Sequence, residues 1–158
     1  LYTLRIVAGA AACGIAVSSW LLTFSLFFFV SLAYLKRAIE LERVEEATKL
    51  PSRNYWGAEL ATVRAFGIAN AAAAMLTLAQ YMSSATASQT YGAADLLWLV
   101  LPLIMFWIYR TWMWACRGKI GDDPVIFAVT DRISQLTLAT TVLLVIAARY
   151  LTMEPLIQ

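Results

Sequence analysis

Long apolar runs separated by short polar connections make up most of this chain, and they predict helices. Apolar positions are nearly continuous within each run, which is typical of helices surrounded by lipid or by other helices. Five such segments follow one another, at about 6–15, 20–35, 58–82, 95–112 and 124–150. The pattern predicts an all-α polytopic transmembrane helix bundle of about five spans, although the first segment is shorter than the roughly 20 residues that cross a bilayer.

The polar residues between the runs predict where the helices end. A charged stretch continues the second helix through Glu46, and its charge density leads us to expect it along the membrane surface. Pro51 cannot continue that helix, so residues 53–55 are expected in a loop. Residues 83–92 are predicted to form a polar loop as well. Asp123-Pro124 indicates an N-cap and a first helical position, which would start the last span.

The composition supports a membrane protein and excludes several functions. Hydrophobic residues make up 61% of the 158 residues and charged residues only 14%, which is too few for a soluble surface. A net charge of +2 gives no reason to expect nucleic-acid binding. The chain has no His, which excludes imidazole as a general base, a metal ligand or a pH switch.

The charged residues are distributed unevenly between the two predicted sides of the membrane. Of the twelve Lys and Arg residues, all except Arg149 lie on or near the side of the loops at 36–57 and 113–123. The positive-inside rule makes that side cytoplasmic. Of the ten acidic residues, all except Asp95 and Glu154 lie there too. Because acidic residues contribute little to orientation, their clustering suggests a metal or phosphate site at the cytoplasmic mouth of the bundle.

Lys36, Arg37 and Glu40 form the first candidate site, at the point where the second span leaves the membrane. Lys36 and Glu40 are four residues apart and share a helix face, and Arg37 lies about 100° away, so all three could reach one polar site. Arg offers a planar fork for phosphate oxygens, Lys a point charge, and Glu a ligand for a metal ion or a sugar hydroxyl. The alternative is a positively charged membrane flank on a solvated helix.

Two further groups are candidates for substrate binding. The first consists of Arg53 and Tyr55 in the predicted loop and Arg64 in the third span. Arg64 could extend its side chain to the interface, or it could face the bundle interior and pair with a ligand anion or with Asp131. The second group consists of Arg117, Asp122, Asp131 and Arg132. Asp131 and Arg132 lie inside the predicted last span, where ionisable residues usually face a polar interior, and a structural ion pair is the alternative.

The order of these features resembles the second half of the UbiA superfamily of membrane prenyltransferases. The likeness is carried by residues 1–9, 36–41, 97–99, 106–110 and 117–132, of which the last stretch is the most specific. The resemblance implies that residues 1–158 are the C-terminal half of a nine-helix transferase domain, with the five spans as its helices five to nine. It also implies a bacterial inner membrane protein with a cytoplasmic active face.

Within the superfamily, the chain is most similar to the branch that includes decaprenyl-phosphate phosphoribosyltransferase. That branch carries Lys-Arg-x-x-Glu, which Lys36, Arg37 and Glu40 match, although Ala38 stands where its members commonly have an aromatic residue. Some bacterial members have an N-terminal haloacid-dehalogenase-like domain, which we expect as a possible part of the full-length protein. The first acidic motif of the family, Asn-Asp-x-x-Asp, is not found in this sequence and would lie upstream of Leu1.

The resemblance implies transfer between a diphosphate-bearing donor and a polyprenyl lipid, with Mg²⁺ as cofactor. Lys36, Arg37 and Glu40 would be the catalytic residues, and Glu40 would add one Mg²⁺ ligand to the main ligands upstream of Leu1. This chain alone would then be inactive. Two alternatives stay open: an aromatic-acceptor prenyltransferase of quinone or haem biosynthesis, and a non-enzymatic membrane transporter or assembly subunit.

Overall fold

The computed structural model describes residues 4–5, 8–9, 12, 18–48, 53–121 and 124–151, with the backbone alone described for 44–48 and 53–58. Every regular element within these ranges is a helix. In chain order the elements are α2 (Ser19–Thr48), α3 (Arg53–Met82), α4 (Ala85–Thr90), the 3-10 helix η1 (Ala94–Leu99), α5 (Val100–Ala115), α6 (Pro124–Thr130) and α7 (Arg132–Tyr150). The predicted all-α fold is confirmed.

Four helical segments in the described ranges are long and apolar enough to cross a membrane. They are Ser19–Arg43 in α2, Glu59–Met82 in α3, Ala94–Ala115 across η1 and α5, and Arg132–Tyr150 in α7. Each is close to the roughly 20 residues that match the hydrocarbon thickness of a bilayer. The chain is therefore a polytopic membrane protein. The first of the five predicted spans falls mostly outside the described residues.

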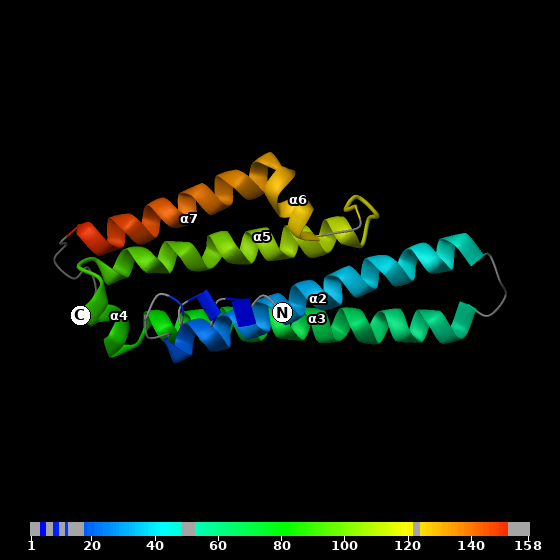
Figure 1. Ribbon diagram of the computed structural model, residues 1–158, viewed down its shortest axis with the longest axis horizontal. Coiled ribbons are helices and arrows are strands. Elements are labelled where there is room, and N and C mark those ends of the chain that lie inside the picture. The colour runs from blue at the N-terminus through cyan, green and yellow to red at the C-terminus, as the bar shows by residue number, and fades with distance from the viewer. Residues whose placement is uncertain are drawn as a thin grey trace.

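The long helices form two antiparallel pairs along the long axis of the molecule (Figure 1). α2 lies beside α3, and ring centroids of Trp20 and Tyr81 are 6.4 Å apart while those of Tyr34 and Phe66 are 5.8 Å apart. α5 and α7 form the second pair, with α4 at one end of the bundle and α6 towards the other (Figure 1). The charged half of α2 therefore lies at the end away from α4.

Small residues allow α2, α3 and α5 to meet closely. The indole of Trp112 in α5 lies against Gly67 of α3, and its Nε1 donates a hydrogen bond to Ser31 Oγ of α2 at 3.2 Å. Ser31 and Trp112 are both buried. Glycine, serine and alanine at such positions let membrane helices approach without a steric barrier, and the serine satisfies the buried indole donor.

The sequence led us to expect the charged stretch of α2 along the membrane surface. In the structure this stretch continues α2 and packs against the neighbouring helices. α2 runs in line to Thr48, beside the first turns of α3 (Figure 1). Its inward side belongs to a core shared with Leu60 and Ile120, and the buried members on α2 are Leu35, Ala38, Ile39 and Leu41. The stretch stays with the bundle because these apolar residues remove one of its faces from solvent.

Two predicted loops are partly helical. Residues 53–55 form the start of α3 instead of a loop. The predicted loop 83–92 contains α4, whose N-cap residue Ser84 accepts a hydrogen bond at its side-chain oxygen from the Ala87 backbone N–H at 3.3 Å. A serine N-cap can start such a helix because it satisfies a backbone donor that the first turn leaves unpaired. At the other end of α4, the Arg149 guanidinium of α7 donates a hydrogen bond to the Thr90 carbonyl.

The last predicted span is interrupted. Pro124 is the first residue of α6, as predicted, but α6 ends at Thr130 and a new helix, α7, starts at Arg132. Asp131 has extended backbone angles and its carboxylate accepts a hydrogen bond from the Ser134 N–H at 2.8 Å. This is N-cap geometry, so the membrane span begins at α7 and Asp131 lies at its end instead of within it.

Candidate functional site

Arg37 is the centre of a charged cluster at the end of the α2–α3 pair. Its Nη1 lies 3.6 Å from Glu40 Oε2 on the same helix, and its Nη2 lies 3.6 Å from Glu59 Oε1 on α3. All three side chains are 40% to 51% exposed. Both distances exceed those of ordinary hydrogen bonds, so the contacts are ion pairs in a solvated setting.

The local sequence of α2 turns this cluster outward. Ala38, Ile39 and Leu41 are buried against α3 and α5, whereas Lys36, Arg37 and Glu40 are exposed. The structure thus brings Arg37 and Glu40 together, and Lys36, the residue before Arg37, is exposed as well.

A second ion pair joins the same two helices nearby. Arg64 of α3 donates a hydrogen bond from Nη2 to Glu42 Oε1 of α2, and both side chains are less exposed than Arg37. The hypothesis that Arg64 pairs with Asp131 is wrong, since Arg64 is held by Glu42 and Asp131 has another partner. Antiparallel packing of α2 and α3 allows this pair, because it places the first turns of α3 beside the end of α2 (Figure 1).

Asp131 forms its ion pair with Arg110, a residue that the sequence analysis did not single out as a candidate. Arg110 Nη1 and Nη2 donate to the two carboxylate oxygens at 2.8 and 3.0 Å. The side chains are only 8% and 15% exposed. The two-point geometry and the low exposure make this a structural pair between α5 and the start of α7. The signal in the sequence was an arginine within an apolar segment, which usually needs a charged partner in the bundle.

Aromatic and hydroxyl groups surround the Arg110–Asp131 pair. The Arg110 guanidinium lies 4.1 Å from the Trp114 ring centroid and 5.6 Å from that of Phe127. Ser134 Oγ donates to Asp131 at 2.9 Å and accepts from Trp107 Nε1 at 2.9 Å. The hydrogen bonds from Arg110 hold the pKa of the Asp131 carboxyl below its usual value of 3.8, against the opposing effect of burial. The carboxylate is thus fully occupied by structural partners.

The remaining predicted site residues lie in the turn after α5 and at the starts of α3 and α7, or outside the described residues. Arg117 and Arg132 are exposed, Arg117 in the turn after α5 and Arg132 at the start of α7. Asp122 lies outside the described residues, and Arg53 and Tyr55 are described by their backbone alone, in the first turn of α3. The turn is formed as predicted, with Gly118 at a φ of 64°. Its Ile120 shares the core of the charged α2 stretch, so Arg117 lies at the same end of the bundle.

The described residues do not form the metal site that the sequence suggests. Within the described ranges, no group of three or more His, Cys, Asp or Glu residues could hold a metal ion. The carboxylate of Glu40 lies beside Arg37, which already supplies a positive charge. The described residues therefore do not fit a Mg²⁺ site by themselves.

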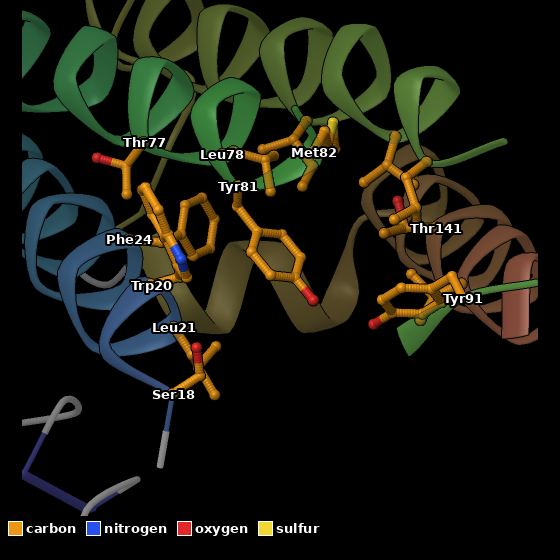
Figure 2. Close-up of a pocket in the computed structure, with 14 residues that line it drawn as sticks. Ser18, Trp20, Leu21, Phe24, Thr77, Leu78, Tyr81, Met82, Tyr91 and Thr141 are labelled. Atoms are coloured by element: carbon orange, nitrogen blue, oxygen red, sulfur yellow. The ribbon is translucent and has the colours of Figure 1, made fainter. Parts of the chain in front are cut away.

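A cavity of about 350 Å³ lies at the other end of the bundle, between α2, α3, α5 and α7. Figure 2 shows Tyr81 in its middle, with Trp20 and Phe24 of α2 on one side and Tyr91 and Thr141 on the other. Most of the other lining residues are aliphatic, such as Leu97, Val100 and Ile104 of η1 and α5. The lining carries no charged residue, so the cavity suits an apolar group.

Similar proteins occur in Sinorhizobium fredii and Azorhizobium caulinodans. The chain is 34% identical over 138 residues to an uncharacterized protein, y4nM, of Sinorhizobium fredii, a match that covers 85% of this chain and 27% of the relative. It is 32% identical over 133 residues to nodulation protein NoeC of Azorhizobium caulinodans, covering 83% of this chain and 43% of that protein. The chain thus spans less than half the length of either relative. No family model and no solved structure matches it.

Proposed function

We propose that this chain is part of an integral membrane transferase of the UbiA type, acting between a diphosphate-bearing donor and a polyprenyl lipid. The donor we favour is phosphoribosyl diphosphate and the acceptor polyprenyl phosphate. The activity would belong to the full-length protein, because the chain spans only 27% and 43% of its two relatives. Both relatives are bacterial, and we place the protein in a bacterial inner membrane with its charged end in the cytoplasm.

The observation that carries the proposal is the outward face of α2 at its charged end. Lys36, Arg37 and Glu40 lie on this face in the Lys-Arg-x-x-Glu order of the phosphoribosyl branch, and all three are exposed. Arg37 keeps donors for an incoming anion, because its two described ion pairs are longer than hydrogen bonds. A cation pair beside a carboxylate fits a phosphorylated sugar.

In the favoured reaction, an oxygen of polyprenyl phosphate bonds to the anomeric carbon of the phosphoribosyl group. The bond from that carbon to the diphosphate oxygen breaks, and diphosphate leaves with the electron pair. Lys36 and Arg37 would stabilise the negative charge that develops on this leaving group. Glu40 would hold a sugar hydroxyl or supply one metal ligand.

Mg²⁺ would supply further charge neutralisation at the leaving diphosphate when bound. We propose that its main ligands come from chain that precedes Leu1, with Glu40 as the contribution of this part. A Mg²⁺ ion needs few protein carboxylates when phosphate oxygens and water complete its shell, so a single glutamate from this half is compatible with such a site.

The other candidate residues divide into two groups. Arg53, Tyr55, Arg117, Asp122 and Arg132 stay candidates for contacts to substrate phosphates. We assign Arg64 and Asp131 to their ion pairs with Glu42 and Arg110. The uncharged cavity around Tyr81 offers space for part of an isoprenoid chain.

The test is a transfer assay on the purified full-length protein with two sets of substrates. One set combines polyprenyl phosphate with labelled phosphoribosyl diphosphate, and the other combines a labelled prenyl diphosphate with an aromatic acceptor. Labelled lipid-linked phosphoribose supports the proposal. A prenylated aromatic product would favour the aromatic-acceptor branch instead. Absence of product from both sets would contradict the enzyme proposal and favour the non-enzymatic alternative.

A further inference from the structure

The two ion pairs of Arg37 differ in kind from the ion pair of Arg110. Arg110 is bonded to Asp131 at two points, 2.8 and 3.0 Å, and is almost buried. Arg37 lies 3.6 Å from each of two carboxylates and is 51% exposed. Arg110 thus commits two guanidinium donors to short hydrogen bonds, whereas the contacts of Arg37 with its two carboxylates balance its charge at distances longer than hydrogen bonds.

Glu59 is the carboxylate that reaches Arg37 from the other helix. It is 40% exposed and is the first residue of the membrane-spanning part of α3. Glu40 lies on the same helix as Arg37, three residues away, and is already part of the proposed site. Glu59 therefore balances the charge of Arg37 from outside the Lys-Arg-x-x-Glu motif.

We propose that Glu59 is a resident counter-ion of Arg37, which the diphosphate group of the donor replaces when it binds. This inference rests on the proposed function, and it adds a residue that sets the affinity of the same site. The exposed, elongated ion pair is weak, so a more highly charged phosphate group can displace it. Glu59 then lowers the affinity of the site for diphosphate, because binding must first compete with its carboxylate.

Replacement of Glu59 by its neutral amide tests the proposal, because the two possible roles predict opposite changes in the affinity for diphosphate. Glu59→Gln removes a negative charge near the bound anion, so inorganic diphosphate should bind about threefold to tenfold more tightly at low salt. If the role of Glu59 were to orient Arg37 productively, the same variant would bind diphosphate more weakly. Titration calorimetry of the full-length protein with inorganic diphosphate, without added metal, measures this affinity.

Two further variants serve as controls for Glu59→Gln. Glu59→Asp keeps the charge and draws the carboxylate back from Arg37 by one methylene, so it should fold like the wild type and give a smaller gain in affinity. Asp95→Asn removes one negative charge in η1, at the end of the bundle opposite the charged half of α2, and should leave the affinity unchanged. Thermal melting of each variant reports whether its fold is intact.

The outcomes separate this inference from the proposed function. Tighter binding by Glu59→Gln, with no change in Asp95→Asn, supports the counter-ion role. If the wild type binds diphosphate and Glu59→Gln binds it equally or more weakly, the counter-ion role is wrong while the proposed function stands. If the wild type shows no saturable diphosphate binding without metal, the counter-ion role is wrong, while the proposed function is decided separately by the transfer assay.

Discussion

Gly67 and Trp112 lie so close that a Cβ atom at position 67 would be 2.3 Å from two carbon atoms of the Trp112 ring. The ring has no free direction in which to move, because the indole is buried and its Nε1 is bonded to Ser31. The Trp112 side chain thus contacts both α3 and α2, and it fixes the distance of α5 from these two helices. A close approach of this kind requires glycine, and it makes the position of α5 depend on the absence of one side chain on α3.

Gly67→Ala should therefore destabilise the full-length protein. The added methyl group would force α3 and α5 apart or displace the indole, and overpacking of this kind costs about 1–3 kcal/mol. The melting temperature in detergent measures the effect. Gly121→Ala is the matched control, because a Cβ there meets nothing within 4 Å. Equal melting temperatures for the two variants would show that the Gly67–Trp112 contact is not required.

Loss of Asp131 should destabilise the protein more strongly. Asp131→Ala removes the N-cap of α7 and leaves Arg110 without its counter-charge, and each effect has a known cost. An unpaired buried charge costs about 3–5 kcal/mol, a lost cap about 1 kcal/mol, and the partial exposure here favours the lower part of that range. Asp131→Asn keeps a capping oxygen and should lose less stability. Arg132→Ala, at an exposed neighbour, should melt within about 0.5 kcal/mol of the wild type.

Arg110 should also make the stability of the protein depend on pH through Asp131. The pKa of this carboxyl is lower in the folded protein than its ordinary value of 3.8. The stabilisation is therefore fully present above that value, and it is lost as the pH falls through the lowered pKa of the folded state. Melting of the wild type and of Asp131→Asn across this range measures it. The difference between them should be constant at neutral pH and should shrink in acid, whereas a difference that grows in acid would contradict the assignment.

The helical spans could be predicted from the sequence because each is a local property. α3 and the segment of η1 with α5 contain nearly continuous apolar runs of the right length, and a proline that follows an aspartate is a local signal for the start of a helix, as at Pro124. The break at Asp131 was missed for a related reason. An aspartate inside an apolar run can be either a polar site within a helix or the cap of a new one, and the sequence pattern alone does not separate these.

The partners of the charged residues could not be predicted in this way. Arg64 can in principle pair with Glu42 or Asp131, and only the packing of α2 against α3 selects Glu42. The contact of Gly67 with Trp112 likewise joins helices that are distant in sequence.

The central claim is that Arg37 binds the donor diphosphate, and the transfer rate of Arg37→Ala tests it most directly. Loss of one such donor to developing charge costs about 100-fold to 1,000-fold in rate. The account predicts that Arg37→Ala reduces kcat/KM with phosphoribosyl diphosphate by at least about 100-fold, while Arg43→Ala, an exposed arginine on the same helix, stays within about twofold. A wild-type rate for Arg37→Ala, or equal losses in both variants, would contradict it.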